Sequence, residues 1–247
     1  MAGAEAQVRK SDLGVRTVSA AVMLAVAGAA LRLGGWPWTA FVALVAAGVL
    51  WEWLVLVRGV ARSPVARGLW NAGGIVYVGL AAFMLILLRF GARGSGELMT
   101  IIAAVIATDI FAYFSGRTFG GPRIAPGISP SKTWAGLIGG MAGAGALMVL
   151  VSYSRYRSDQ DWFAAQGADA VLHGPITFEW LPALAVGAGI AVVAQTGDFF
   201  ESWMKRKAGV KDSGRLIPGH GGLFDRVDGL LAVLFVFGGL MLAGLVV

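Results

Sequence analysis

Cysteine is absent from the chain of 247 residues, and histidine occurs only twice. The absence of cysteine excludes a disulfide framework and any metal site built on thiolates. Charged residues are scarce as well, at 14% of the sequence, whereas a soluble domain has roughly 25%. So few charges cannot cover a water-exposed surface, and 57% of the residues are hydrophobic. The composition therefore indicates an integral membrane protein.

Long apolar runs account for most of the chain. Seven segments approach the roughly 20 apolar residues that one membrane-spanning helix needs, and lipid favours helices because it cannot satisfy backbone polar groups. We predict an all-α polytopic membrane protein, a bundle of about seven transmembrane helices, or up to about nine if short or broken ones are counted. We expect one membrane domain, with N-terminal helices over residues 1–97 and a catalytic region over 98–247. The segments are Thr17–Leu33, Trp38–Val57, Leu69–Leu88, Leu98–Phe114, Trp134–Val151, Leu181–Gly197 and Gly229–Val247.

Basic residues gather in alternate loops between these segments. Such a bias marks the cytoplasmic side of a membrane protein, so we expect four basic stretches to face the cytoplasm. The opposite loops, Gly34–Pro37, Arg89–Glu97 and Tyr153–Trp180, are short or less basic. The four basic stretches hold Arg9, Lys10 and Arg16; Arg58, Arg62 and Arg67; Arg117, Arg123 and Lys132; and Lys205, Arg206, Lys207, Lys211, Arg215 and Arg226.

Three carboxylates, Glu52, Asp109 and Asp198, fall within or beside the apolar segments, where a charge is costly. Each lies near the predicted cytoplasmic end of its helix, which suggests a shared polar cavity. We expect Glu52 to reach the membrane interface or to cap a helix. Asp109 and Asp198 stand beside dense polar motifs, and for these two we expect a functional role.

The most polar stretch of the sequence lies between the last two apolar segments. If the sixth helix continues past Gly197, then Asp198, Ser202 and Lys205 share one face of it. A carboxylate, a hydroxyl group and a cation on one stripe can hold a metal-bound phosphate. This spacing predicts one wall of a site for a phosphorylated substrate.

A glycine-rich turn and two further carboxylates follow. The glycines of Pro218-Gly-His-Gly-Gly222 would let backbone amides approach an anion closely. Asp225 and Asp228 then stand one helical turn apart. Carboxylates bind Mg²⁺, which is usually shared with substrate phosphates, and lysine and arginine neutralise charge on a phosphoryl group under attack. The pattern is typical of phosphoryl transfer.

The same stretch resembles the signature of the phosphatidate cytidylyltransferase family, also called CDP-diacylglycerol synthases. It reads Ser202-x-Met-Lys-Arg-x₄-Lys-Asp-x-Gly-x₂-Ile-Pro-x-His-Gly-Gly-Leu-x-Asp-Arg-Val-Asp228 and meets every fixed position of that signature. Further matches to the family are Asp109-x-Phe-Ala-Tyr-Phe-x-Gly-Arg-x-Phe-Gly120, Ser129-Pro-Ser-Lys-Thr-Trp134, Gln195-x-Gly-Asp198 and Trp51-Glu-Trp53. One departure is Ala135, where the family usually has glutamate, so an acidic contact is missing there.

The resemblance implies the transfer of CMP from CTP to phosphatidate, giving CDP-diacylglycerol and pyrophosphate. It implies one or two Mg²⁺ ions, with a monovalent ion as an open addition, and an active site at the cytoplasmic edge of a bacterial inner membrane. CTP, phosphatidate and membrane lipids are the expected partners. No nucleic acid is expected, and a homodimer is compatible with the sequence.

Residue roles follow from the motifs. We predict Asp198, Asp225 and Asp228 as metal ligands, and Asp198, Asp225, Lys132 and His220 as catalytic residues. His220 has three open roles, which are phosphate contact, proton shuttle and filling of a tight turn. Lys132 is expected in a turn between the fourth and fifth segments, sharing one site with the C-terminal motif. The predicted substrate-binding residues are Ser129, Thr133, Ser202, Lys205, Arg206, Lys211, Asp212, Arg226, Asp109 and Arg117.

Four alternative functions remain at this point. A relative acting on another lipid phosphate has the same phosphate-handling residues. A CDP-alcohol phosphotransferase would carry an Asp-Gly-x₂-Ala-Arg segment, which is absent. A transporter would use the intramembrane carboxylates but would not need the basic glycine-rich loop. A catalytically inactive scaffold has only Ala135 in its favour.

Overall fold

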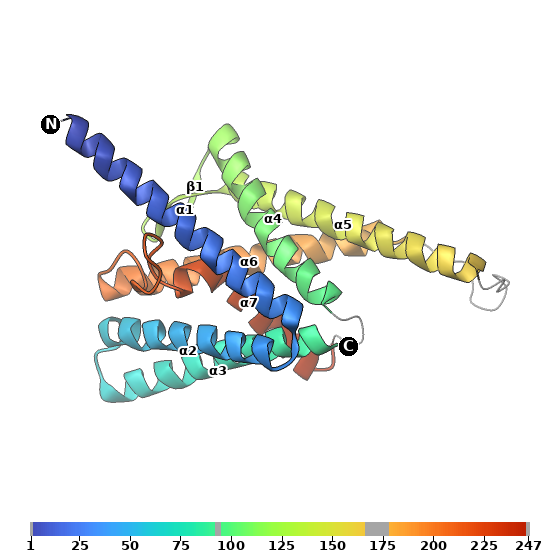
Figure 1. Cartoon of the computed structure of the whole chain (residues 1–247), viewed down its shortest axis with the longest axis horizontal. Coiled ribbons are helices and arrows are strands. Elements are labelled where there is room, and N and C mark those ends of the chain that lie inside the picture. The colour runs from blue at the N-terminus through green and yellow to red at the C-terminus, as the bar shows by residue number, and fades with distance from the viewer. Residues whose placement is uncertain (1, 92–94, 166–177, 246–247) are drawn as a thin grey trace. The chain divides into compact units, whose positions relative to one another are not determined.

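Seven helices and one short β-hairpin make up the computed structural model, which describes residues 2–91, 95–165 and 178–245 (Figure 1). Side chains are described over residues 14–91, 95–162 and 178–245, so Arg9 and Lys10 of the predicted basic tail lie outside them. The elements are α1 Ala2–Leu33, α2 Gly35–Val60, α3 Pro64–Phe90, α4 Gly96–Phe119, β1 Arg123–Ala125, β2 Ser129–Thr133, α5 Trp134–Ala165, α6 Trp180–Ala208 and α7 Phe224–Leu242.

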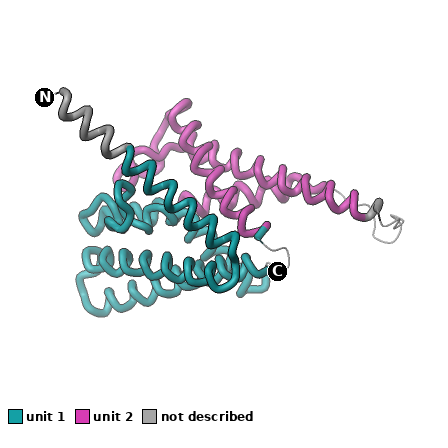
Figure 2. Tube along the Cα trace, in the orientation of Figure 1, with its two compact units in different colours: residues 1–95, 197–247 teal, residues 96–196 magenta. Residues whose placement is uncertain are grey.

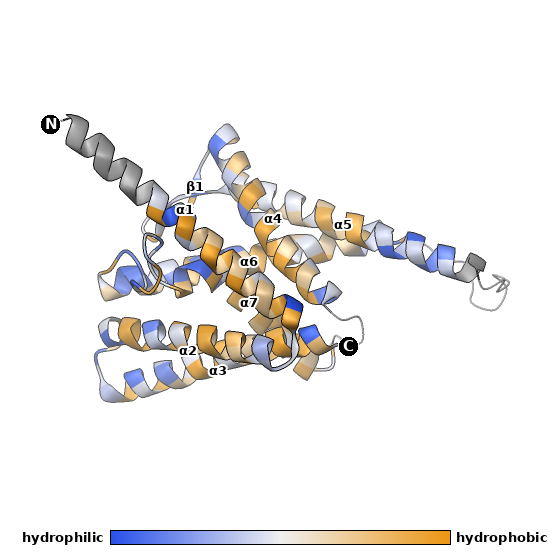
Figure 3. Cartoon of the chain, viewed as in Figure 1, coloured by the Kyte–Doolittle hydropathy of each residue, from blue (hydrophilic) through white to orange (hydrophobic). Residues whose placement is uncertain are grey.

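Six of these helices, α1 to α6, are long and apolar enough to cross a membrane. Apolar residues predominate along the helices, whereas polar residues gather at helix ends and in the connection from α6 to α7 (Figure 3). Large apolar side chains such as Leu44, Ile75 and Ile138 are exposed. Exposure on this scale is unfavourable in water but fits contact with lipid tails. The predicted all-α membrane fold is confirmed.

The helix ends differ from the predicted ends where polar residues continue a helix. α5 runs to Ala165, so the prediction of a loop from Tyr153 onward was wrong for the first part of that segment. Local hydrogen bonds support this polar extension, because Ser158 Oγ donates to Ser154 O and Gln160 Nε2 donates to Tyr156 Oη, one turn away each.

The chain forms two compact units, one of residues 1–95 and 197–247 and the other of residues 96–196 (Figure 2). The helix α6 begins in the second unit and enters the first at Gly197. The predicted division of a single membrane domain at residue 97 stays a prediction.

In the first unit, α3 packs against α2 and α7. Ser63 caps α3, because its hydroxyl accepts a hydrogen bond from Ala66 N at 3.1 Å, and Pro64 occupies the first turn. Trp53 of α2 is buried against α3 and donates from Nε1 to Trp70 O at 3.0 Å. A methyl group at Gly74 would collide with this indole ring, so glycine sets the approach of α2 to α3.

In the second unit, α4 and α5 approach closely through small residues. Added methyl groups at Gly139 and Gly143 of α5 would collide with Ser115 and Phe111 of α4. The hairpin precedes α5 and pairs Arg123 with Thr133. The turn expected around Lys132 is therefore wrong, because residues 129–133 form strand β2. Sheet pairing with residues 123–125, which the motif alone does not indicate, extends this backbone.

Candidate functional site

The site predicted from the C-terminal motif lies in the first unit, where the end of α6, the connection 209–223 and the start of α7 come together. The helix α6 continues past Gly197 to Ala208, so Asp198, Ser202 and Lys205 share one face as predicted. Ser202 Oγ donates to Asp198 Oδ1 at 3.4 Å, a long hydrogen bond. The helix thus supplies the predicted stripe of carboxylate, hydroxyl and ammonium groups.

Lys205 links two carboxylates from different helices. Its Nζ lies 2.6 Å from Asp225 Oδ1 at the start of α7 and 2.6 Å from Glu201 Oε2, one turn earlier on α6. Glu201 is only 1% exposed, and apart from this ion pair its oxygens have no hydrogen-bond partner among the described residues. The lysine therefore offsets the negative charge of the Asp225 carboxylate, and the buried Glu201 side chain lies against the same ammonium group.

Asp225 also organises the connection between α6 and α7. Its Oδ2 accepts hydrogen bonds from Ser213 N and from Gly222 N, each at 2.9 Å, and Ser213 Oγ lies at the same distance. The predicted approach of a glycine-loop amide to an anion is therefore observed, and the anion is a carboxylate of the chain itself.

Glu52 of α2 accepts hydrogen bonds from the end of the same connection and from the start of α7. It is 2% exposed, and its carboxylate accepts hydrogen bonds from Leu223 N at 3.0 Å and Phe224 N at 2.8 Å. These amides begin α7, where a negative charge is favourable. Ser213 Oγ lies 2.9 Å from Glu52 Oε2 as well. The expectation that Glu52 reaches the interface is wrong, and the alternative that it caps a helix is confirmed.

Glycines allow the loop to close on these carboxylates. A methyl group at Gly222 would collide with Ser213 Oγ and the Glu52 carboxylate, and one at Gly214 would collide with Glu52 as well. Gly221 has a φ of 84°, in the left-handed region that favours glycine. The unusual composition of Pro218–Gly222 thus has a direct steric cause.

His220 lies at the tip of this turn. Its Nδ1 is 2.8 Å from Ser19 Oγ of α1, and its backbone oxygen accepts a hydrogen bond from Arg226 Nη2 at 2.7 Å. The predicted tight-turn position is confirmed, whereas phosphate contact and proton transfer by the imidazole stay predictions. Arg226 contributes to the turn while the rest of its side chain is exposed.

The remaining predicted residues of this unit surround the cluster. Asp228 is partly buried and its Oδ1 accepts a hydrogen bond from Gly229 N at 2.8 Å. α6 passes close to it, since a methyl group at Gly197 would contact the Asp228 carbonyl group. Arg206, Lys211 and Asp212 are exposed.

The other predicted residues belong to the second unit. Asp109 and Arg117 are exposed on α4, and Arg117 Nη1 donates to Tyr113 Oη at 3.1 Å. Ser129 is buried, Lys132 is partly buried, and Thr133 Oγ1 accepts a hydrogen bond from Gly136 N at 3.1 Å, which caps α5. That these residues share one site with the C-terminal motif stays a prediction.

A metal ion at these carboxylates would have to be completed by substrate. Within the described residues, no three His, Asp or Glu side chains are grouped as a metal site, and both oxygens of Asp225 already accept hydrogen bonds. Mg²⁺ commonly takes one or two carboxylates and fills its other positions with phosphate oxygens and water. That Asp198 and Asp228 fill this limited role stays a prediction.

Two residues of the cluster, Glu201 and Ser213, were not predicted from the sequence. Glu201 stands four residues before Lys205, a spacing that favours an ion pair on a helix, so this contact could have been predicted from the sequence. Ser213 had no such signal, because its hydroxyl contacts Glu52, which is 161 residues away in the sequence.

Comparison with known proteins shows the family of the chain. The sequence profile described as "Cytidylyltransferase family" matches residues 63–243. A phosphatidate cytidylyltransferase of Brucella abortus biovar 1 is 42% identical over 219 residues, covering 84% of this chain and 73% of the relative. Proteins of the same name from Rickettsia bellii and Rickettsia typhi are 32% identical, covering 81% and 80% of this chain and 79% and 78% of their own lengths. The chain therefore belongs to the cytidylyltransferase family and is a nucleotidyltransferase of the membrane.

Proposed function

We propose that this chain is a phosphatidate cytidylyltransferase, which transfers CMP from CTP to phosphatidate and releases pyrophosphate. The observation that carries the proposal is the 42% identity to a relative of that name over 84% of the chain. The cluster around Lys205 and Asp225 supports it, because carboxylates and cations meet there beside an apolar helix bundle.

The reaction needs alignment and charge neutralisation more than covalent catalysis. A phosphate oxygen of phosphatidate attacks the α-phosphorus of CTP, a new P–O bond forms, and the bond to the pyrophosphate group breaks. Both substrates are anions, so the protein must hold them in line and offset the charge that builds up between them. Exposed Arg206 and Lys211 are suited to the phosphates of the entering nucleotide.

Lys205 has a defined place in this scheme. An ammonium group has three N–H donors; the Asp225 carboxylate accepts one of them, and a second points to the ion-pair contact with Glu201. The third is left for a phosphate oxygen. Because the two carboxylates fix its position, the ammonium group meets the substrate with little loss of conformational freedom.

Magnesium belongs to the proposal as well. Asp198 and Asp228, with Asp225 as the predicted third carboxylate, would hold one or two Mg²⁺ ions together with substrate phosphates. The ion would supply positive charge at the reacting phosphoryl group. The cluster then faces the cytoplasm of a bacterial inner membrane, where a lipid head group and a soluble nucleotide meet.

The test is a CTP-consumption assay with purified protein in detergent, phosphatidate and Mg²⁺. We expect CDP-diacylglycerol and pyrophosphate in equal amounts, and loss of both when a chelator removes the metal. A polyprenyl phosphate in place of phosphatidate separates the two lipid acceptors. Turnover with the polyprenyl phosphate alone would reject phosphatidate as the substrate, and no turnover with either would reject the transferase reaction on these lipids.

A further inference from the structure

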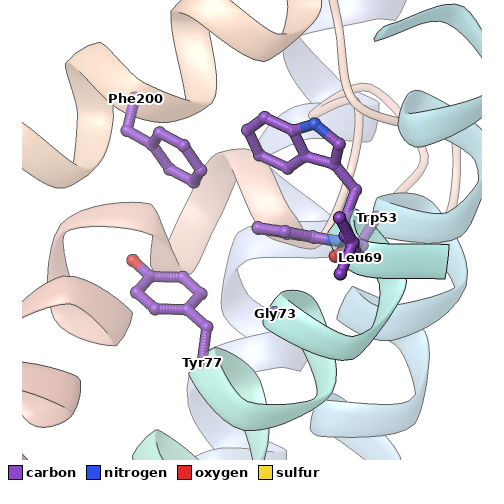
Figure 4. Close-up of a pocket in the computed structure, with 6 residues that line it drawn as sticks. Trp53, Leu69, Gly73, Tyr77 and Phe200 are labelled. Carbon is purple, nitrogen blue, oxygen red and sulfur yellow. Dashed lines mark hydrogen bonds between the residues drawn. The ribbon is translucent and has the colours of Figure 1, made fainter. Parts of the chain in front are cut away.

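An apolar pocket of about 460 Å³ opens in the first unit beside the polar cluster. Side chains of α2, α3 and α6 surround it, and Figure 4 shows the aromatic rings around an open space above Gly73. Its volume falls in the range of about 300–1,000 Å³ that is common for sites of small ligands. The lining residues are Trp53, Leu69, Trp70, Gly73, Tyr77 and Phe200.

The lining carries no charge, which limits what the pocket can bind. Its rings pack against one another, with centroid distances of 5.8 Å between Trp53 and Phe200 and 6.1 Å between Tyr77 and Phe200. A triphosphate or a free metal ion would lose its hydration in such a pocket without compensation. A hydrocarbon chain, in contrast, gains by leaving water or by filling a void.

Two of the three helices around the pocket, α2 and α6, also carry residues of the polar cluster. Trp53 follows Glu52 on α2, and Phe200 precedes Glu201 on α6. The Trp53 ring also lies 5.8 Å from the ring of Phe224, the residue before Asp225. The apolar pocket and the charged cluster are therefore joined by neighbouring residues of α2 and α6 and by the contact of Trp53 with Phe224.

We propose that this pocket is a subsite for one acyl chain of the lipid phosphate substrate. The inference rests on the proposed function and adds to it where the apolar part of the substrate lies. In a phosphatidate molecule a short glycerol ester unit joins the charged phosphate to two hydrocarbon chains, so its binding site needs a polar and an apolar part near one another. Leu69, at the rim, is 71% exposed, which leaves the pocket open for a chain to enter from the lipid.

Gly73 offers a way to fill the pocket without disturbing the fold. It lines the pocket, and a Cβ atom placed on it would meet no atom within 4 Å. The variant Gly73→Leu thus places a side chain into the proposed chain path. Gly79→Leu is the matched control, because Gly79 lies on the same helix, is exposed, has equally open space and is not part of the pocket lining.

The assay compares dioleoyl phosphatidate with dihexanoyl phosphatidate. We expect Gly73→Leu to raise the KM for the dioleoyl lipid by about tenfold, the effect of overpacking a site that the acyl chain would otherwise fill. The KM for CTP should stay unchanged, the KM for the dihexanoyl lipid should change much less, and Gly79→Leu should behave as the unchanged protein does. Gly73→Ala, which adds a single methyl group, should give a smaller rise in the KM for the dioleoyl lipid. This variant tests the inference if Gly73→Leu does not fold.

Three outcomes would overturn the inference. Equal KM values for the dioleoyl lipid in Gly73→Leu and the unchanged protein would mean that a bulk lipid or a second copy of the chain covers the pocket. An equal rise in the KM for both lipids, or the same rise in KM in Gly79→Leu, would mean that the pocket does not bind the acyl chain. The proposed function fails separately, by an absence of turnover in the unchanged protein.

Discussion

At the scale of single residues, Asp225 joins three parts of the site. Its Oδ1 contacts Lys205 of α6, and its Oδ2 contacts Ser213 and Gly222 of the connection between α6 and α7. An ionised carboxylate accepts about four hydrogen bonds, so nearly all acceptor positions of this side chain are occupied. Any replacement has to supply the same acceptors.

Asp225→Asn should lower turnover by about 10²–10³-fold, as is typical when one electrostatic group is removed from an active site. The asparagine amide has one acceptor oxygen, so its NH₂ group would face either the Lys205 ammonium group or the backbone amides of Ser213 and Gly222, all of which are donors. Steady-state CTP consumption measures the effect, with insertion checked by membrane fractionation. Asp159→Asn, on an exposed part of α5, is the control; turnover near that of the unchanged protein for Asp225→Asn would contradict the assignment.

Glu52 acts through other residues, since its three donors belong to Ser213, Leu223 and Phe224. We expect Glu52→Gln to lower the free energy of unfolding by about 1–3 kcal/mol, because the amide leaves a buried donor unsatisfied. At temperatures well below the melting temperature, turnover should also be lower than in the unchanged protein, because the start of α7 no longer holds Asp225 in its position. The KM for CTP should change little. Glu52→Asp, which keeps the charge, should recover part of the turnover; a loss of stability alone would make Glu52 purely structural.

The sequence predicted some of these residues and not others for a physical reason. Lys205 and Asp225 stand within one dense motif, so their proximity followed from short spacing along two helices. Glu52 lies 161 residues before Ser213, and a contact at that separation depends on how α2 packs against α7. A single apolar helix carries no signal that specifies this partner.

At the scale of elements, the connection 209–223 is built around buried carboxylates rather than around apolar residues. Gly222 contacts Ser213 and Glu52 so closely that a side chain has no room. Gly222→Ala should therefore lower the free energy of unfolding by about 1–3 kcal/mol, as for other overpacked sites, and should reduce turnover in parallel. Thermal unfolding and CTP consumption measure the two effects.

Gly239→Ala is the matched control for this variant. Gly239 is exposed on α7, and a methyl group there would meet no atom within 4 Å. The change should be neutral or slightly stabilising, because alanine favours a helix over glycine. Similar stability losses in both variants would contradict the steric explanation for Gly222.

Helices were the most predictable elements, because runs of apolar residues long enough to span a bilayer have few other stable forms. Their ends were less predictable, as α5 shows by continuing through polar residues to Ala165. The hairpin β1–β2 was missed because its strands have three and five residues, too short for a periodic pattern. Register in so short a pair depends on its neighbours.

At the scale of the whole molecule, two anionic substrates bring several negative charges to one site, and we predict that Lys132 is among the cations that offset them. Lys132→Ala should reduce turnover or raise a substrate KM by tenfold or more, in line with the loss of a charge-assisted hydrogen bond of about 1.5–3 kcal/mol. Lys132→Arg should recover only part, since a planar fork does not replace a compact ammonium group. Separate titrations of CTP and phosphatidate identify which phosphate is held, and unchanged KM and turnover in Lys132→Ala would remove Lys132 from the site.

The orientation of the chain in the membrane provides the last prediction, and the absence of cysteine makes it easy to test. The basic stretches predict that Arg62, Lys132 and Lys211 face the cytoplasm. Single cysteines at these positions should resist an impermeant thiol reagent in intact cells and react once the membrane is opened. A cysteine at Ser158, in the predicted opposite loop, should react in intact cells. Labelling of position 211 from outside would reverse this orientation, and cytosolic CTP would then not reach the cluster around Asp225.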